Sequence, residues 1–166
     1  MSTNALVKAG EAVHHDELIQ LVSFKLDNEE YGVEVLKVRE IIRMPTITKM
    51  PNTPQYVEGI INLRGKVIPI ISLRKRFSLM ENDADSQTRI IIMDVAGGMT
   101  GFTVDAVSEV IRILSSEIQP SPTVAAGGVG QEFITGVINH GERLLVLLEL
   151  ERMFSNEEKE FLSDIG

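Results

Sequence analysis

The sequence predicts an all-β protein made of two small barrels that pack together, and three observations support this prediction. Residues 32–43 match residues 101–112 at six of twelve positions, at an offset of 69 residues. Residues 56–78 align without a gap with residues 133–155, at an offset of 77 residues. Short β-rich runs are also separated by turn residues at close intervals. A two-part motif repeated in the same order indicates two units of one fold.

Length and composition fit this prediction and exclude several classes of function. Two units of roughly 70 residues are each marginal alone, so we expect one cooperative body over the 166 residues. The net charge of −8 argues against nucleic-acid binding, which needs an excess of Lys and Arg. The absence of cysteine excludes disulfides and thiolate zinc sites. No signal peptide or membrane-length apolar run is visible, which predicts a cytoplasmic protein.

The first half of the chain predicts a tail followed by a hairpin. Residues 1–16 are polar and predict a mobile N-terminal tail. Residues 18–26 and 31–35 are β-rich and flank a polar turn, as in a hairpin, and residues 41–44 predict a further short strand.

A helix, a second hairpin and another short helix are expected next. Thr53-Pro54 is typical of a helix start, and Gly59 is then expected to end that helix. Residues 60–71 predict two strands joined by a turn with Gly65 at its special position. Ser72 can cap a short helix that runs through Arg76.

The second half predicts the same order of elements. Residues 89–95 and 101–107 predict a hairpin, and residues 120–130 predict a flexible, glycine-rich loop. The capping box Ser155-Asn156-Glu157-Glu158 predicts a C-terminal helix over residues 156–166. The expected organisation is one domain over residues 17–155, with repeats at about 18–80 and 88–155.

Candidate catalytic groups are few, so the sequence predicts no enzyme, no cofactor and no metal site. His14 and His15 fall in the expected tail, and His140 falls in a hairpin turn. No two histidines on one element stand at a spacing typical of zinc ligands. Asp94 and Asp105 could meet across a hairpin, although exposed acids at strand ends are the more common interpretation.

Comparison of the two copies singles out Arg64. Glu40 and Arg43 recur as Glu109 and Arg112, which favours a repeated charge contact or a solvated strand edge. Arg64 does not recur, because Gly141 is aligned with it, so the turn does not require an arginine. An exposed arginine on a rigid loop is a candidate binding group. For the cationic run 74–76, we expect a solvated helical face.

The run Gly59-Ile60-Ile61-Asn62-Leu63-Arg64-Gly65, with Val38-Arg39-Glu40-Ile41 before it, closely resembles the CheW family of bacterial chemotaxis adaptors. The resemblance covers residues 18–155. It implies two five-stranded barrels of the OB/SH3-like kind around a shared core, with strands that can be exchanged between the barrels. It also implies a non-enzymatic adaptor with two partners, namely the cytoplasmic tip of a chemoreceptor (a methyl-accepting chemotaxis protein) and the regulatory domain of the kinase CheA. The membrane is then reached only through the receptors.

The resemblance also implies receptor-binding residues. The family's receptor-binding arginine falls on Arg64, its glutamate on Glu40 and the neighbouring valine on Val38. Other positions linked to receptor coupling fall on Gly59, Ile90 and Val110. We expect Glu40 to brace Arg64 in an ion pair. No kinase-binding residue is predicted. Arg89 stands where the family commonly has an apolar residue.

Three other interpretations share part of the pattern. A single oligonucleotide-binding barrel should show stacking aromatics and a basic face, but this chain has eight Phe and Tyr in total and an acidic charge. A kinase fragment or an adaptor fused to a receiver domain would share the resemblance, but the length leaves no room for a receiver. An enzyme with an unfamiliar site is the third.

Overall fold

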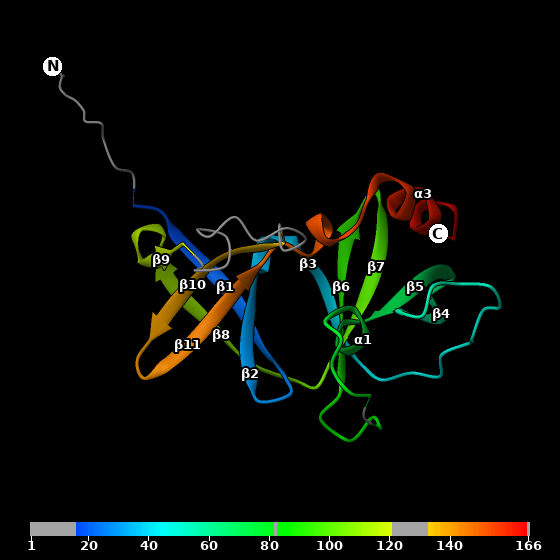
Figure 1. Ribbon diagram of the computed structural model, residues 1–166, viewed down its shortest axis with the longest axis horizontal. Helices are drawn as coiled ribbons and strands as arrows, with labels where there is room; N and C mark the ends of the chain where they lie inside the picture. The colour runs from blue at the N-terminus through cyan, green and yellow to red at the C-terminus, as the bar shows by residue number, and fades with distance from the viewer. Residues whose placement is uncertain (1–15, 82, 121–132, 166) are drawn as a thin grey trace, which may run out of the picture.

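The computed structural model describes residues 16–81, 83–120 and 133–165. Predictions for the tail, including His14 and His15, and for most of the loop at 120–130 lie outside these residues. Figure 1 shows two groups of strands side by side along the long axis, with α3 against the second group. This arrangement confirms the predicted all-β fold of two packed units.

Within the described residues, the first sheet has six strands in the order β8-β1-β2-β11-β10-β9. All neighbours are antiparallel except the parallel pair β2–β11. The strands are β1 (Leu18–Leu26), β2 (Glu29–Glu34), β8 (Ala106–Leu114), β9 (Ile118–Gln119), β10 (Ile134–His140) and β11 (Arg143–Leu148).

The second sheet, over the part of the chain that the structure describes, has five strands in the order β3-β6-β7-β5-β4, and β5 and β7 are its parallel pair. The strands are β3 (Val38–Arg43), β4 (Val57–Leu63), β5 (Lys66–Ser72), β6 (Arg89–Val95) and β7 (Gly98–Val104). The helical segments are α1 (Leu73–Arg76), α3 (Asn156–Ile165) and the 3-10 turns η1 (Val35–Lys37), η2 (Ser115–Glu117) and η3 (Leu150–Met153).

Each sheet combines strands from both halves of the chain. The β1–β2 hairpin lies in the sheet with β8 to β11, and the β6–β7 hairpin lies in the sheet with β3 to β5. Among the described residues, the strands change sheet through η1 after β2 and through Asp105 after β7, and after β11 the chain returns to the second sheet, where α3 contacts β5 and β7. A cut between the two sequence copies would therefore divide both sheets.

Three apolar clusters account for the burial pattern. Each sheet curves around its own cluster, and a third, larger cluster lies between the sheets. Strands with one face on each cluster are buried on both sides, which explains the absence of strict alternation. The first sheet encloses Leu21, Ile111, Ile113, Ile138, Leu145 and Leu147, and the second encloses Ile61, Ile68, Ile70, Ile90 and Ile92.

The predicted caps are present, but the helix predicted at Thr53-Pro54 is not. Ser72 Oγ accepts the Lys75 N–H at 3.2 Å, and Ser155 and Glu158 form the reciprocal capping box. After Pro54 the chain makes a single turn, with Val57 N–H donating to the Pro54 carbonyl, and then enters β4. Pairing of β4 with β5 therefore overrides the local helix signal.

Gly59 does not end a helix; it lies inside β4 and allows another segment to approach. Its φ is +149°, and a Cβ there would come closer than 3.0 Å to the Thr48 carbonyl oxygen and 2.8 Å from Ile47 Cγ2. The repeated glycine, Gly136, is crowded in the same way by Ile118 Cγ2 at 2.6 Å and the Gln119 oxygen at 2.7 Å. Both glycines are thus needed where a further segment pairs with the sheet.

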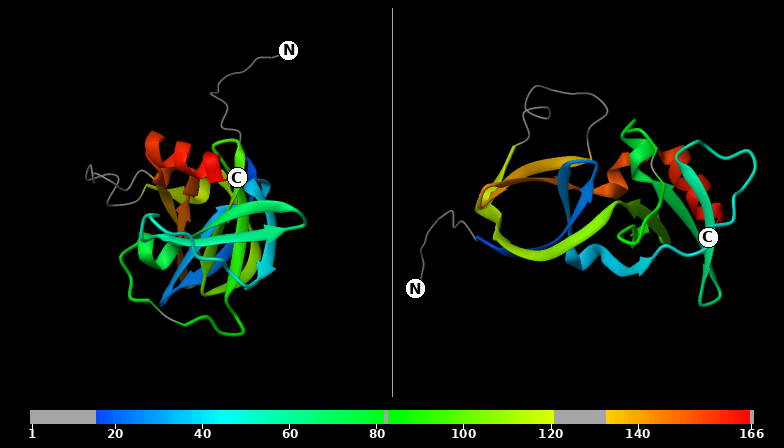
Figure 2. Two further views of the ribbon diagram at one scale, coloured as in Figure 1. Left: turned by 90° about the vertical axis from the view of Figure 1, so that its right-hand side faces the viewer. Right: turned by 90° about the horizontal axis from the view of Figure 1, so that it is seen from below.

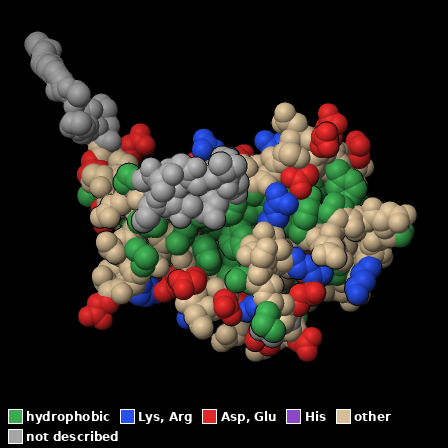
Figure 3. Space-filling model, viewed as in Figure 1, with side chains coloured by type: hydrophobic (Ala, Val, Ile, Leu, Met, Phe, Trp, Pro, Cys, Tyr) green, Lys and Arg blue, Asp and Glu red, His purple; other side chains and the backbone are tan. Residues whose placement is uncertain are grey.

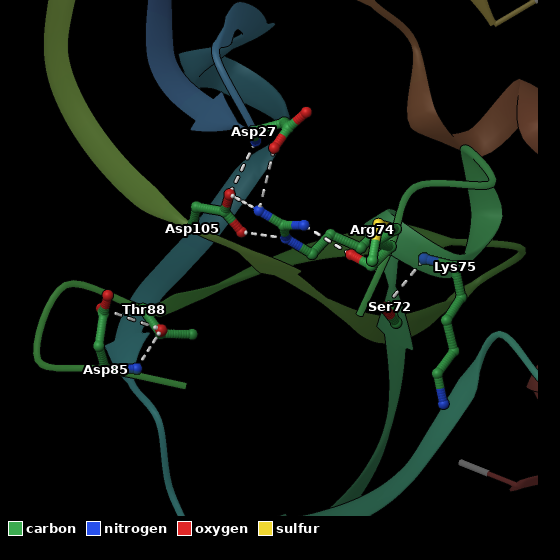
Figure 4. A network of polar contacts seen from close by, with 8 residues as sticks. Asp27, Ser72, Arg74, Lys75, Asp85, Thr88 and Asp105 are labelled. Atoms are coloured by element: carbon green, nitrogen blue, oxygen red, sulfur yellow. Dashed lines mark hydrogen bonds and ion pairs between the residues drawn. The ribbon is translucent and has the colours of Figure 1, made fainter. Parts of the chain in front are cut away.

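Ion pairs fasten the two sheets together, and Figure 4 shows one of these clusters. The Arg74 guanidinium donates to both carboxylate oxygens of Asp105 at 2.8 and 2.6 Å, and Asp105 also accepts the Asp27 N–H at 2.7 Å. The expected solvated face at 74–76 is therefore wrong, since the Arg74 side chain is only 13% exposed. Asp94 does not meet Asp105 either, because the two residues lie at opposite ends of the β6–β7 hairpin, and Asp94 pairs with Arg39 instead.

Candidate protein-binding surface

Arg64 lies at the tip of the two-residue turn between β4 and β5. Its φ is +51° and that of Gly65 is +87°, while Asn62 Oδ1 accepts the Gly65 N–H at 2.9 Å. In the other copy Gly141 occupies the same place with a φ of +65°. An arginine in this left-handed conformation is less favourable than glycine, so the turn itself does not explain the presence of Arg64.

Glu40 holds the Arg64 side chain, as expected. Two guanidinium nitrogens of Arg64 donate to the two carboxylate oxygens of Glu40, with Nη1 3.3 Å from Oε2. These hydrogen bonds keep the pKa of Glu40 below its ordinary value. Glu40 lies on β3 and Arg64 follows β4, and these two strands are the edges of the sheet. The ion pair therefore links the two edge strands, β3 and β4, which are not hydrogen-bonded to each other.

The other sheet carries a corresponding pair with a different arginine. Glu109 on the edge strand β8 accepts from Arg143 Nη2 at 2.6 Å. Arg143 aligns with Lys66 and not with Arg64. The recurring glutamate therefore pairs with an arginine in both copies, while the Arg64 position is specific to one copy.

Two exposed apolar residues lie at matching positions on the edge strands. Ile41 on β3 and Val110 on β8 are 37% and 60% exposed, and they occupy equivalent places in the repeat. They pair with Ile91 and Val22, which belong to the core between the sheets. Both views of Figure 2 show β3 (cyan) and β8 (yellow-green) along the same side of the molecule. This side offers apolar contact next to the inter-sheet core.

The structure brings together only some of the predicted site residues. Arg64, Glu40 and Val38 all belong to the second sheet, whereas Val110 lies on the edge of the first. Ile90 is fully buried and Gly59 is buried in β4, so neither can contact a partner directly. That part of the prediction is corrected: these two residues shape the sheet that carries Glu40 and Arg64.

Sequence reasoning missed Ile41 as a surface residue. The repeat could have identified Ile41, because Ile41 aligns with the predicted site residue Val110 and each of the two residues directly follows the recurring glutamate.

A separate open cleft lies between the sheets, lined by Tyr31, Phe77, Phe133, Met153, Phe154 and Arg76. Figure 3 shows apolar side chains gathered in the middle of the face viewed in Figure 1. Among the described residues, no cluster of His, Cys, Asp or Glu could hold a metal ion. None of the described helices is both long and apolar enough to cross a membrane.

Comparison with known proteins fits this architecture. The family model described as CheW-like domain matches residues 20–158. The chain belongs to the CheW-like family. It is 37% identical to the chemotaxis protein CheW of Klebsiella aerogenes over 158 residues, which cover 95% of this chain and 92% of that protein. The chemotaxis protein CheW of Treponema pallidum is 35% identical over 168 residues, covering 94% and 98% respectively.

A solved structure supports the same assignment. The crystal structure of scaffolding protein TtCheW from Thermoanaerobacter tengcongensis matches with a TM-score of 0.77 and 37% identity, covering 86% of this chain and 97% of that one. Membership of the CheW-like family confirms the prediction of a non-enzymatic chemotaxis adaptor with a β-rich fold.

Proposed function

We propose that this adaptor couples the cytoplasmic tips of transmembrane chemoreceptors to the regulatory domain of the histidine kinase CheA. The observation that carries the receptor part is Arg64. It is 70% exposed, it is held in a defined position by Glu40, and it occupies a turn position where glycine would be more favourable. The presence of a less favourable residue at an exposed turn position points to a binding role.

The partner surface that fits this site is a helix. Exposed Ile41 and Val110 supply apolar contact on the side bordered by β3 and β8. The Arg64 guanidinium is held by Glu40, which directly precedes Ile41 on β3. An amphipathic helix that lies in an apolar groove uses this combination of an apolar stripe and a charged anchor. A chemoreceptor tip is a helical hairpin, so it presents such helices.

Kinase contact requires a different surface. We propose Val67 and Leu144, which are 41% and 53% exposed at equivalent positions near the starts of β5 and β11. Exposed apolar residues at the ends of both sheets suit contact with a domain of similar architecture. This arrangement would place the adaptor in the cytoplasm, recruited to membrane-associated receptor arrays through its partners.

A pull-down with a receptor-tip fragment and a CheA regulatory domain tests both parts. Arg64→Glu should weaken capture of the receptor fragment at least tenfold while leaving the fold and kinase capture unchanged. Arg152→Glu, a charge reversal on η3, is the matched control and should leave both unchanged. Val67→Lys and Leu144→Lys should weaken kinase capture alone. Receptor capture that survives Arg64→Glu would contradict the receptor part.

Charge reversal at Glu40 tests whether the ion pair contributes to the site. Glu40→Lys removes the acceptor that positions the guanidinium, so receptor binding should fall as it does in Arg64→Glu. If Glu40→Lys leaves Arg64-dependent binding intact, the bracing role is wrong.

A further inference from the structure

Three arginines on the outer faces of the sheets have no ion pair among the described residues. Arg43 and Arg112 occupy equivalent positions at the ends of the repeated edge-strand block, and both are exposed. Arg43 lies directly opposite Arg89 in the β3–β6 ladder. The Arg89 guanidinium donates to the Ser86 and Thr88 carbonyl oxygens at 2.9 Å. No described carboxylate therefore compensates these three charges within the chain.

The alternation of the strands places these arginines beside the exposed apolar residues. Arg43 is two residues from Ile41, and Arg112 is two residues from Val110, so each arginine shares a face with its apolar neighbour. Both faces lead into the core between the sheets, because Ile41 pairs with Ile91 and Val110 pairs with Val22. The cationic groups thus border the same surface from both sheets.

This arrangement is unfavourable for the isolated protein. Like charges directly opposite each other on neighbouring strands are destabilising. The chain has 24 acidic and 16 basic residues, so carboxylates are abundant, and yet none of those described pairs with these arginines. Arg39, Arg64, Arg74 and Arg143, in contrast, each have a carboxylate partner.

We propose that Arg43, Arg89 and Arg112 form a cationic border that selects a helix carrying acidic side chains on both sides of its apolar stripe. The inference rests on the proposed receptor contact and adds the charge pattern of the partner. Charge complementarity determines which partner helix fits. Ile41 and Val110 contact the apolar stripe of the helix, and the arginines pair with the Glu or Asp side chains that flank this stripe. Arg43 and Arg89 serve one side of the helix, and Arg112 serves the other.

The test compares the wild-type chain, the variant Arg43→Gln/Arg89→Gln/Arg112→Gln and the control Arg152→Gln. The probes are a receptor-tip hairpin and the same hairpin with the Glu and Asp residues flanking its stripe changed to Gln and Asn. The triple variant should bind the native hairpin about tenfold more weakly than wild type, with a smaller salt dependence. Wild type should bind the neutralised hairpin equally weakly, and the control should bind like wild type.

A thermal-unfolding measurement separates binding from folding. The melting temperature of the triple variant should stay close to that of wild type, because relief of the repulsion between Arg43 and Arg89 offsets the loss of the two Arg89 hydrogen bonds. A lower melting temperature would mean that the arginines serve the fold, which would overturn the inference.

Three further results would refute the inference, in one case together with the proposed receptor contact. If Arg64→Glu weakens binding while the triple variant binds like wild type, the inference fails and the proposed receptor contact stands. If wild type does not bind the native hairpin, both fail. Phosphatidylserine-containing vesicles serve as a third probe: if the triple variant binds the hairpin like wild type but loses binding to the vesicles, the border contacts lipid and the helix proposal is wrong.

Discussion

Replacement of Gly59 by alanine should destabilise the protein strongly, because Gly59 permits a backbone bridge between two segments. Thr48 N–H donates to the Ile60 oxygen at 2.9 Å, and Ile60 N–H donates to the Thr48 oxygen at 2.8 Å. A Cβ at Gly59 would overlap that Thr48 oxygen. The variant must therefore move the segment around Thr48 away and lose both hydrogen bonds.

The magnitude follows from two terms. Loss of the two hydrogen bonds costs about 1 kcal/mol each. A non-glycine residue at a φ of +149° adds about 1–3 kcal/mol of backbone strain. The free energy of unfolding should therefore fall by about 3–5 kcal/mol, which for a chain of this size lowers the melting temperature by roughly 10 °C.

Two glycines of the same chain serve as controls in urea and thermal unfolding. Gly97 has a φ of +81°, and a Cβ at this position would have no described atom within 4 Å, so Gly97→Ala should cost only about 1 kcal/mol. Gly136→Ala meets the steric conflict without the unfavourable φ and should be intermediate. If Gly59→Ala unfolds at the same urea concentration as Gly97→Ala, the bridge does not stabilise the fold as argued.

Three further variants test other parts of the structure. Arg64→Gly should leave the melting temperature close to that of wild type, because the better fit of glycine to a φ of +51° offsets the loss of the exposed ion pair with Glu40, while receptor binding falls at least tenfold; unchanged binding would contradict the proposed role. Burial acts to raise the pKa of Asp105, but hydrogen bonds from Arg74 and the Asp27 N–H outweigh it, so the pKa lies below 3.8. Ionised Asp105 therefore stabilises the folded state above pH 3.8, its ordinary pKa, and this stabilisation is lost as the pH falls through the lower pKa of the folded state. Asp105→Asn should lower the free energy of unfolding by about 2 kcal/mol at pH 7 and make it less dependent on pH in the acid range, as measured by urea unfolding at several pH values. Tyr56→Phe removes the 2.7 Å hydrogen bond to Glu158 and should loosen α3, seen as faster amide hydrogen exchange in that helix with little change elsewhere.

Local sequence signals predicted elements wherever no distant strand competed with them. The strand at Leu18–Leu26 and the caps at Ser72 and Ser155 depend on side chains within a few residues, and they form as predicted. The helix signal at Thr53-Pro54 failed because β4 gains a full ladder of hydrogen bonds from β5. Propensity is a weak preference that such pairing overrides.

For the candidate site, the repeat alone identified Arg64 as dispensable for the turn, and the family resemblance assigned it a partner. The sequence could not show that Ile90 is buried, because a strand buried on both faces has no alternation to reveal which side chains reach the surface. Nor could it show that Arg43 and Arg89 lie opposite each other, since that depends on the register between β3 and β6.

The sequence by itself determined the duplication, the β class and the family, because these are carried by residue identities and their spacing. Only the tertiary structure decided which hairpin joins which sheet, why Gly59 and Gly136 recur, and which arginines have carboxylate partners. The physical reason is that these features depend on contacts between residues tens of positions apart, where backbone pairing and steric exclusion outweigh local preference.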